Sequence, residues 1–269
     1  MGRVIIAHAD ESSPRAFPAL AGVAASEGVA SRAVVAADDR PLFAWVHKLS
    51  PDAAIRWARP PVGHVVYVWE GSAVAAGDQG KPDTQLEEGS VLAVEHGGEG
   101  ALRAGADGAK LVHFHQREGA DPPVKAGGHS HVIGKEGVFT SSGPRSHGGT
   151  VGVRMWLDSS CPTCGLWLHQ NSFSDLTPQG KAHYHTEDEI IFVVQGGLVL
   201  GRQTHPPGTA LAIDANTVYG FGVAEGGMAF INFRPVDPTV IMMSREGPGP
   251  ARKEREVLRN LHTPEQRTH

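Results

Sequence analysis

Residues 183–196 read HYHTEDEIIFVVQG, and this stretch sets the expectations for both fold and chemistry. One residue separates His183 from His185, so on an extended chain both imidazoles point to the same face. Glu189 follows, and five β-branched and aromatic residues then lead into the turn at residues 195–197. Imidazole and carboxylate side chains together suit a first-row transition metal. The stretch therefore predicts a metal site on one face of a strand that ends in a turn.

The composition of the chain is that of a globular β protein. Of its 269 residues, 20% are charged and 40% are hydrophobic, and the 34 glycines and 19 prolines separate many short strand-like runs. This pattern predicts an all-β barrel or sandwich. A net charge of -5 without a basic block argues against a nucleic-acid partner. No apolar run approaches the ~20 residues of a membrane span and no signal peptide is recognisable, so we expect a cytoplasmic protein.

Changes in composition divide the chain into five expected segments. Between the two strand-rich regions the sequence becomes rich in Pro, Gly, Ser and His, which is typical of a linker or a surface excursion. We expect an N-terminal arm over residues 1–40, a barrel over 41–118, the linker over 119–148, a second barrel over 149–240 and a tail over 241–269.

The two strand-rich regions look like copies of one unit. Three glycines recur at matching places, with the same interval between the second and the third: Gly71, Gly89 and Gly108 in one copy, and Gly196, Gly208 and Gly227 in the other. Counting back from the first glycine puts His64 at the position of Glu189, whereas the paired histidines have no counterpart in the first copy. We therefore expect one metal site per chain, in the second copy, and interpret His113 and His115 as core or cleft histidines.

The pattern HxH, three residues, Glu, six residues, Gly resembles the first motif of the cupin family, small β-barrels that hold a metal inside the barrel mouth. The second cupin motif is matched in part: Gly208 fits, Asp214 and Asn216 replace its Pro and Gly, and Tyr219 replaces its final histidine. The resemblance covers about two thirds of the chain. It implies two cupin jelly-roll barrels in one chain, a bicupin whose N-terminal barrel is degenerate.

The resemblance also implies one divalent transition metal per chain, held by His183, His185 and Glu189. Iron fits a two-histidine, one-carboxylate set, with manganese, nickel, zinc or copper as alternatives. Tyr219 has three open roles: a fourth ligand as phenolate, a hydroxyl that donates a hydrogen bond to the substrate, or a residue of the barrel wall.

Strand parity adds further candidates for the same cavity. Alternate residues of a strand share a face, so residues two apart on strands near the histidine pair are expected to point inwards. Arg234 is expected to clamp a carboxylate through two hydrogen bonds and, with Tyr219, to be catalytic. The expected substrate-binding residues are Trp167, His169, Phe192, Phe221 and Asn232.

Three functions fit these residues. The first is a metal-dependent oxygenase that acts on a small aromatic or carboxylate-bearing molecule. The second is a metal-dependent isomerase, lyase or decarboxylase, in which the metal acts as a Lewis acid. The third is a non-catalytic protein that binds a small molecule. Because barrels of this kind offer sheet edges that a partner could cover, we also expect a homodimer.

The chain has two cysteines, Cys161 and Cys164, in the sequence CPTC. The spacing matches a thioredoxin-like redox motif, but no βαβ pattern surrounds it. A four-ligand zinc site needs two more ligands, and the candidates His129, His131 and His147 are not anchored by any pattern. The favoured interpretation is a hairpin tip with two reduced thiols.

Overall fold

The computed structural model describes residues 2–36, 39–77, 82–119, 125–135, 139–144, 150–158, 160–174 and 181–254. Strands dominate these residues, so the predicted all-β fold is confirmed. Among them, no helix is long and apolar enough to cross a membrane. The chain divides into two compact units, described separately below. Unit 1 comprises the described residues of Met1–His8, Phe139–Asp158 and Trp167–His269, and unit 2 those of Ala9–Val138 and Ser159–Leu166.

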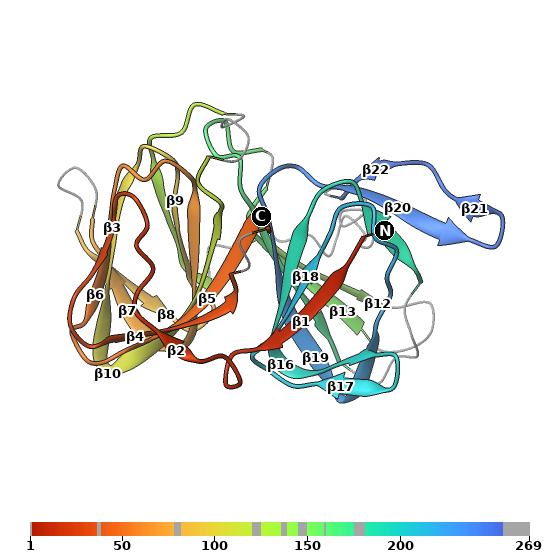
Figure 1. Cartoon of the computed structure of the whole chain (residues 1–269), viewed down its shortest axis with the longest axis horizontal. Coiled ribbons are helices and arrows are strands. Elements are labelled where there is room, and N and C mark those ends of the chain that lie inside the picture. Colours follow the sequence, from red (N-terminus) through yellow and green to blue (C-terminus); the bar gives the residue numbers. More distant parts are fainter. Residues whose placement is uncertain are drawn as a thin grey trace. The chain divides into compact units, whose positions relative to one another are not determined.

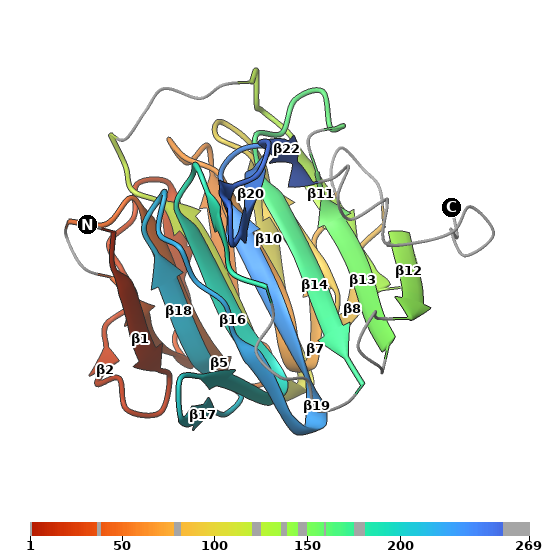
Figure 2. The same cartoon turned by 90° about the vertical axis from the view of Figure 1, so that its right-hand side faces the viewer.

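Unit 1 contains an eight-stranded antiparallel sheet in the order β1-β18-β16-β19-β14-β13-β12, with β17 paired to β16. A four-stranded sheet of β15, β20, β21 and β22 completes it. Figure 2 shows β18, β16, β19 and β14 side by side. The strands are β1 (Val4–His8), β12 (Phe139–Pro144), β13 (Thr150–Leu157), β14 (Trp167–Phe173), β15 (His183–His185), β16 (Glu189–Leu200), β17 (Gln203–His205), β18 (Thr209–Ile213), β19 (Gly222–Arg234), β20 (Thr239–Ser244), β21 (Gly247–Pro248) and β22 (Arg252–Lys253).

Unit 2 is built on one ten-stranded sheet, whose main path is β11-β9-β7-β10-β5-β4-β2. Strand β6 pairs with β10 and β3, and β8 pairs with β7. Figure 1 shows these strands in red to yellow-green. Their bounds are β2 (Pro14–Arg15), β3 (Val23–Ala25), β4 (Val29–Val35), β5 (Leu42–Leu49), β6 (Ala54–Ala58), β7 (His64–Ala75), β8 (Thr84–Glu87), β9 (Val91–Val94), β10 (Glu99–Gln116) and β11 (Ser130–Ile133).

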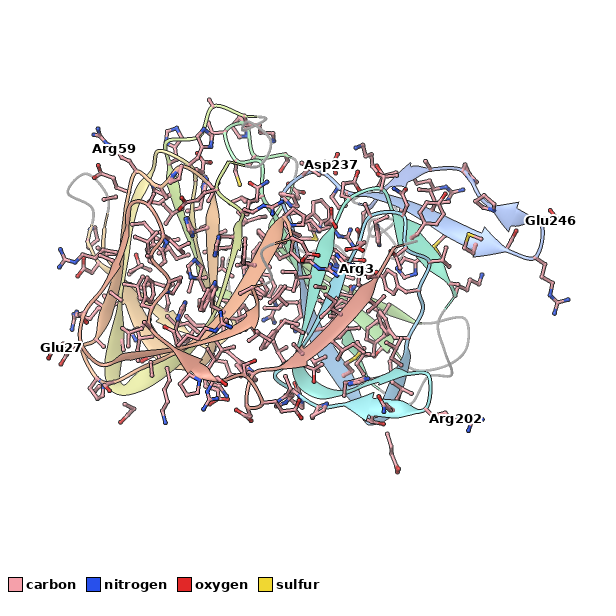
Figure 3. The ribbon with its side chains drawn as sticks, in the orientation of Figure 1. Arg3, Glu27, Arg59, Arg202, Asp237 and Glu246 are labelled. Atoms are coloured by element: carbon pink, nitrogen blue, oxygen red, sulfur yellow. The ribbon has the colours of Figure 1, made fainter. Side chains whose placement is uncertain are left out.

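Each unit has its own apolar core, formed by alternate residues of its strands. In unit 1, Ile191 and Val193 of β16 pack with Leu211 and Phe230. In unit 2, Val66 and Val68 of β7 belong to a cluster that also contains Trp57. Charged side chains in the turns and bends between strands, such as Glu27, Arg59, Arg202 and Glu246, point outwards (Figure 3). Burial of the apolar residues at about 25 cal/mol per Å² is the main stabilising term for such sheets.

The internal repeat expected from the glycines corresponds to a repeated backbone conformation. All six of these glycines have positive φ, for example 76° at Gly71 and 69° at Gly196. A Cβ at Gly71 would lie 2.6 Å from the carbonyl oxygen of Gly108, and one at Gly196 would lie 2.1 Å from that of Gly227. Only glycine tolerates both this φ and this approach of two strands. The equivalent strands β7 and β16 are both 12 residues long.

The units are not continuous in sequence, unlike the expected segments. Residues 1–40 form β1 of unit 1 and β2–β4 of unit 2 rather than an arm. The expected linker contains β11 and β12, and its residues 120–124, 136–138 and 145–148 lie outside the described residues. Residues 159–166, expected within the second barrel, belong to unit 2. The tail forms β21 and β22, and residues 255–269 lie outside the described part.

Candidate functional site

The two paired histidines lie on β15 in unit 1 with their Nε2 atoms directed at a cavity. His183 Nδ1 lies 3.2 Å from the carbonyl oxygen of Lys181, and His185 Nδ1 lies 2.9 Å from that of Thr239. A carbonyl only accepts hydrogen bonds, so each Nδ1 carries the proton and each Nε2 offers a lone pair. Metal-ligating histidines are oriented in this way in proteins. The short strand thus presents two neutral imidazoles as ligands.

Glu189 begins β16 and is buried beside these histidines. Its Oε2 accepts hydrogen bonds from Asn232 Nδ2 at 2.7 Å and Arg234 Nε at 3.2 Å. Its Oε1 is buried with no hydrogen-bond partner among the described residues and lies 3.9 Å from His185 Nε2. A buried carboxylate oxygen without a donor is costly, and a cation is one means of satisfying it. The expected ligands are therefore close together, with one oxygen unsatisfied.

Arg234 is held by acidic residues and is not free to bind a substrate. Its guanidinium pairs with Glu189 and with Glu254, and Nη2 donates to His185 Nε2 at 3.0 Å. Only 1% of the side chain is exposed. The structure thus corrects the expectation that Arg234 clamps a carboxylate of the substrate: it neutralises two carboxylates of the protein. A metal bound by His185 must displace the Nη2 hydrogen bond.

Glu254 is a residue of this site that the sequence did not indicate. It follows β22, and its Oε1 lies 3.7 Å from His169 Nε2 while its Oε2 lies 3.8 Å from His185 Nδ1. No spacing pattern links Glu254 to the histidine pair. The hydrogen bond from its backbone N–H to the carbonyl oxygen of Pro238 fixes it against the loop before β20.

Tyr219 faces the metal-binding residues, as its position in the second motif implied. Its backbone pairs with that of His183, and its hydroxyl lies 3.1 Å from His183 Nε2. Because Nδ1 of His183 is the protonated nitrogen, the phenol O–H donates this hydrogen bond. Burial and the charge of Glu189 hold the pKa of Tyr219 well above its ordinary value. The residue is therefore a neutral donor in this structure.

The charges in the site follow from burial and from Arg234. Burial and the charge of Arg234 together lower the pKa of His185 to about 3 and that of His169 to about 3. Burial alone would raise the pKa of Glu189, but the charge of Arg234 and the hydrogen bond from Asn232 hold it below its usual range. At neutral pH the histidines are neutral and the carboxylate is ionised.

These residues surround a cavity of about 260 Å³ inside unit 1. One part of its lining is polar, with His169, Asn171 and Asn232, and another is apolar, with Phe221 and Phe230. Lys181 also lines it and is exposed. The volume lies below the ~300–1,000 Å³ of pockets for drug-sized ligands, so the cavity suits a small molecule.

Two of the expected substrate-binding residues do not line the cavity. Phe192 is on the opposite face of β16, and the residue that lines the cavity is its neighbour Ile191. The expectation erred by one residue of register, which inverts the face of a strand. Trp167 is fully buried behind the lining, and its Nε1 donates a 2.7 Å hydrogen bond to Nδ1 of His169. Trp167 thus orients a residue of the lining.

Comparison with known proteins places this fold among solved structures. No protein-family model matches the sequence, and no curated protein matches it. The structure of protein Ylba from E. coli, described with the family DUF861, matches with a TM-score of 0.66 at 14% identity, over 86% of this chain and 90% of that one. A mutant of Bacillus subtilis oxalate decarboxylase OxdC matches with a TM-score of 0.59 at 11% identity, over 86% of this chain and 77% of that one.

The fold is a cupin fold. A further structure of B. subtilis oxalate decarboxylase, described as having Mn(II) centres, matches with a TM-score of 0.59 at 13% identity, over the same shares of the two chains. At these identities the similarity establishes the jelly-roll architecture alone. The donor set in this fold, two imidazole nitrogens and a carboxylate with an unsatisfied oxygen, fits a divalent transition metal.

Proposed function

We propose that this cupin is a metal-dependent enzyme that acts on a small carboxylate-bearing molecule as a lyase, isomerase or decarboxylase. One divalent metal per chain is held in unit 1 by His183, His185 and Glu189. Manganese and iron both suit this mixture of nitrogen and oxygen ligands. When bound, the metal supplies Lewis-acid activation of a carboxylate or carbonyl oxygen.

The observation that carries the proposal is the balance of charge around the cavity. Glu189 and Glu254 are opposed by Arg234 alone, and the histidines are neutral. A divalent cation added to this set leaves a net positive charge in a buried site, which favours an anionic ligand. Lys181 adds an exposed ammonium to the lining. A small carboxylate satisfies both the charge and the volume.

Tyr219 is the proposed proton donor to the bound substrate. Its hydroxyl is protonated, buried and adjacent to His183, and the cavity places it among the lining residues. Tyr219→Phe should retain the metal and lower turnover by roughly ten- to a hundredfold, since it removes one hydrogen bond made in the transition state. Equal metal content and equal turnover in the variant would assign Tyr219 to the barrel wall. A visible charge-transfer band that disappears in the variant would instead identify a phenolate ligand.

An oxygenase is the second candidate. Two histidines and one carboxylate form the ligand set of non-haem iron oxygenases, and the apolar lining from Phe221 and Phe230 suits an aromatic substrate. Oxygen uptake distinguishes the two reactions, because only the oxygenase consumes oxygen with its substrate.

The test combines metal analysis with turnover of a panel of small mono- and dicarboxylates, in air and without oxygen. We expect purified protein to contain one transition metal in unit 1, and turnover to proceed without oxygen. His185→Ala should lose that metal and all turnover, whereas Phe192→Leu, on the opposite face of β16, should keep both. Full metal occupancy in His185→Ala would refute the ligand assignment, and loss of turnover without oxygen would favour the oxygenase.

We further propose that the chain is a bicupin in which unit 2 is the degenerate barrel, and that it forms a homodimer. The repeated glycine conformations support two copies of one barrel. Among the described strands, β1 and β12 form the two edges of the sheet of unit 1, and sheet edges are sites where another chain can pair. Light scattering should give twice the 28.4 kDa of the chain, and a monomer at working concentration would refute the dimer.

A further inference from the structure

A second group of potential metal ligands lies in unit 2, outside the barrel interior. Glu95 follows β9, His131 lies on β11, and the CPTC sequence contributes Cys161 and Cys164. One ligand atom from each lies within 4.8 Å of the others. Glu95 and Cys164 are buried, and Cys161 and His131 are half-buried. Four residues from three separate segments therefore converge on one point.

The backbone around the cysteines is arranged to stabilise sulfur ligands. The N–H of Cys164 donates to Sγ of Cys161 at 3.2 Å, and the N–H of Leu166 donates to Sγ of Cys164 at 3.3 Å. Residues 161–165 read CPTCG, so proline and glycine shape the tight turn that aims these amides at the sulfurs. Hydrogen bonds to the sulfur atoms compensate the charge of thiolate ligands.

The oxygen and nitrogen ligands are also held in place. Glu95 Oε2 accepts from the backbone N–H of His129 at 3.0 Å, and Oε1 accepts from the hydroxyl of Thr163 at 2.8 Å. Nε2 of His131 lies 2.8 Å from Oε1 of Glu95, and Sγ of Cys161 lies 3.9 Å from each of these two atoms. In a tetrahedral zinc site, ligand distances of about 2.0–2.3 Å separate sulfur from nitrogen or oxygen by roughly 3.5 Å. The sulfur separations need a small contraction, and the 2.8 Å between Nε2 of His131 and Oε1 of Glu95 needs a small expansion.

We propose that Cys161, Cys164, His131 and Glu95 bind a structural zinc ion. Two soft thiolates with one imidazole and one carboxylate select zinc over the harder cations, and four protein ligands leave no open position for catalysis. Binding releases the two thiol protons, and His131 ligates through Nε2 with its N–H on Nδ1. The ion fastens the segment 160–166 to β9 and β11 within unit 2. It is independent of the metal in unit 1.

A dithiol redox centre fits the same residues less well. Reactive CxxC pairs are partly exposed and lie at a helix N-terminus, which lowers the pKa of the attacking thiol. Here the segment carries no helix, and Cys164 is 1% exposed. The two further ligands would also have no role in disulfide exchange.

The test is metal analysis of the full chain, with cobalt as the spectroscopic probe. Wild-type protein should contain about one equivalent of zinc that is released when a mercurial reagent modifies the thiols. Cobalt loaded in place of zinc should give the intense near-ultraviolet band of thiolate-to-cobalt charge transfer. This band requires no variant, so it tests the site even where a substitution prevents folding. Wild-type protein without the band, or with a Cys161–Cys164 disulfide after purification under reducing conditions, would overturn the proposal.

Variants separate this site from the metal site in unit 1. Cys161→Ser should lose the zinc and keep the metal of unit 1, whereas His185→Ala should do the reverse. Thr163→Val keeps all four ligands but removes the hydrogen bond to Glu95, and should weaken zinc binding roughly 10- to 100-fold. Zinc retained at full affinity in Cys161→Ser would refute the assignment, whatever the outcome for unit 1.

Discussion

The interiors of the two units show how one strand framework holds either a charged site or a neutral one. Strand pairing makes β16, β19 and β14 of unit 1 equivalent to β7, β10 and β5 of unit 2. With Glu189 matched to His64, the registers match Asn232 to His113, Arg234 to His115 and His169 to Trp45. An ion pair in one unit is thus replaced by two histidines in the other.

The histidines of unit 2 form hydrogen bonds with one another, although Nε2 of His64 has no partner among the described residues. His113 lies between two of them, with Nδ1 at 3.1 Å from His47 Nε2 and Nε2 at 2.9 Å from His64 Nδ1. Burial lowers the pKa of His47 and of His64 to about 3, and of His115 to about 4, so all carry no charge at neutral pH. The comparison teaches that a buried histidine cluster alone does not predict a metal site. Imidazole groups that line a cavity and a carboxylate with an unsatisfied oxygen distinguish unit 1.

The largest expected effect comes from removing the buried cation of unit 1. Arg234→Met leaves Glu189 and Glu254 without their partner and should lower the free energy of unfolding of metal-free protein by about 3–5 kcal/mol. His115→Met, at the equivalent position of unit 2, removes no charge and should cost about 1–3 kcal/mol, since Trp45 loses its acceptor. Urea unfolding, with amide hydrogen exchange to follow each unit separately, measures the loss of unfolding free energy in both variants. Equal losses of unfolding free energy in the two variants would contradict the expected difference between the charged interior of unit 1 and the neutral interior of unit 2.

A second effect concerns the response of unit 2 to acid. The pKa of His64 falls from 6.5 to about 3 on folding, so the unfolded chain binds the extra proton. This contribution is fully present above pH 6.5 and is lost as the pH falls towards 3, at about 1.4 kcal/mol per pH unit. His64→Phe should therefore destabilise less at pH 5 than at pH 7, by about 2 kcal/mol. Urea unfolding at both pH values tests this, and a constant difference would show that His64 is accessible to protons in the folded state.

The smallest expected effect tests a feature that both interiors share. Trp167 donates to His169 at 2.7 Å, and Trp45 donates to His115 at 3.3 Å. Replacing either tryptophan by phenylalanine removes a neutral hydrogen bond worth about 1 kcal/mol, and the shorter bond of Trp167 should give the larger loss. Thermal unfolding of the metal-free variants compares them. A larger loss for Trp45→Phe would show that packing, not hydrogen bonding, dominates.

The sequence predicted the part of the site whose residues are close together in the chain. It did not predict the part whose residues are far apart. The HxH pattern, the acid and the strand behind them are adjacent in the chain, so strand periodicity was enough to group His183, His185 and Glu189. The ion pair of Arg234 with Glu254 depends on how the end of the chain packs, and no spacing encodes it. For the CPTC pair the sequence offered His131 as one of several candidate ligands but no pattern that singles it out, and it did not indicate Glu95, which lies far away in the chain. The prediction that Phe192 lines the cavity was wrong because the alternation of residues along a strand does not say which of the two faces points inwards.

Each unit is assembled from separate stretches of the chain. This arrangement affects how the protein folds during synthesis and whether proteolysis can separate the units. Strand β1 pairs with β18, which is synthesised about 200 residues later, and unit 2 is complete only when residues 160–166 have emerged (Figure 1). During synthesis β1 therefore waits for a distant partner strand and unit 2 for a distant loop, a condition that favours slow folding and aggregation. A cut anywhere in residues 119–148 would release neither unit whole. In a circular permutant that joins β1 directly to the end of unit 1, β1 and β18 would be closer together in the chain and would be synthesised closer together in time.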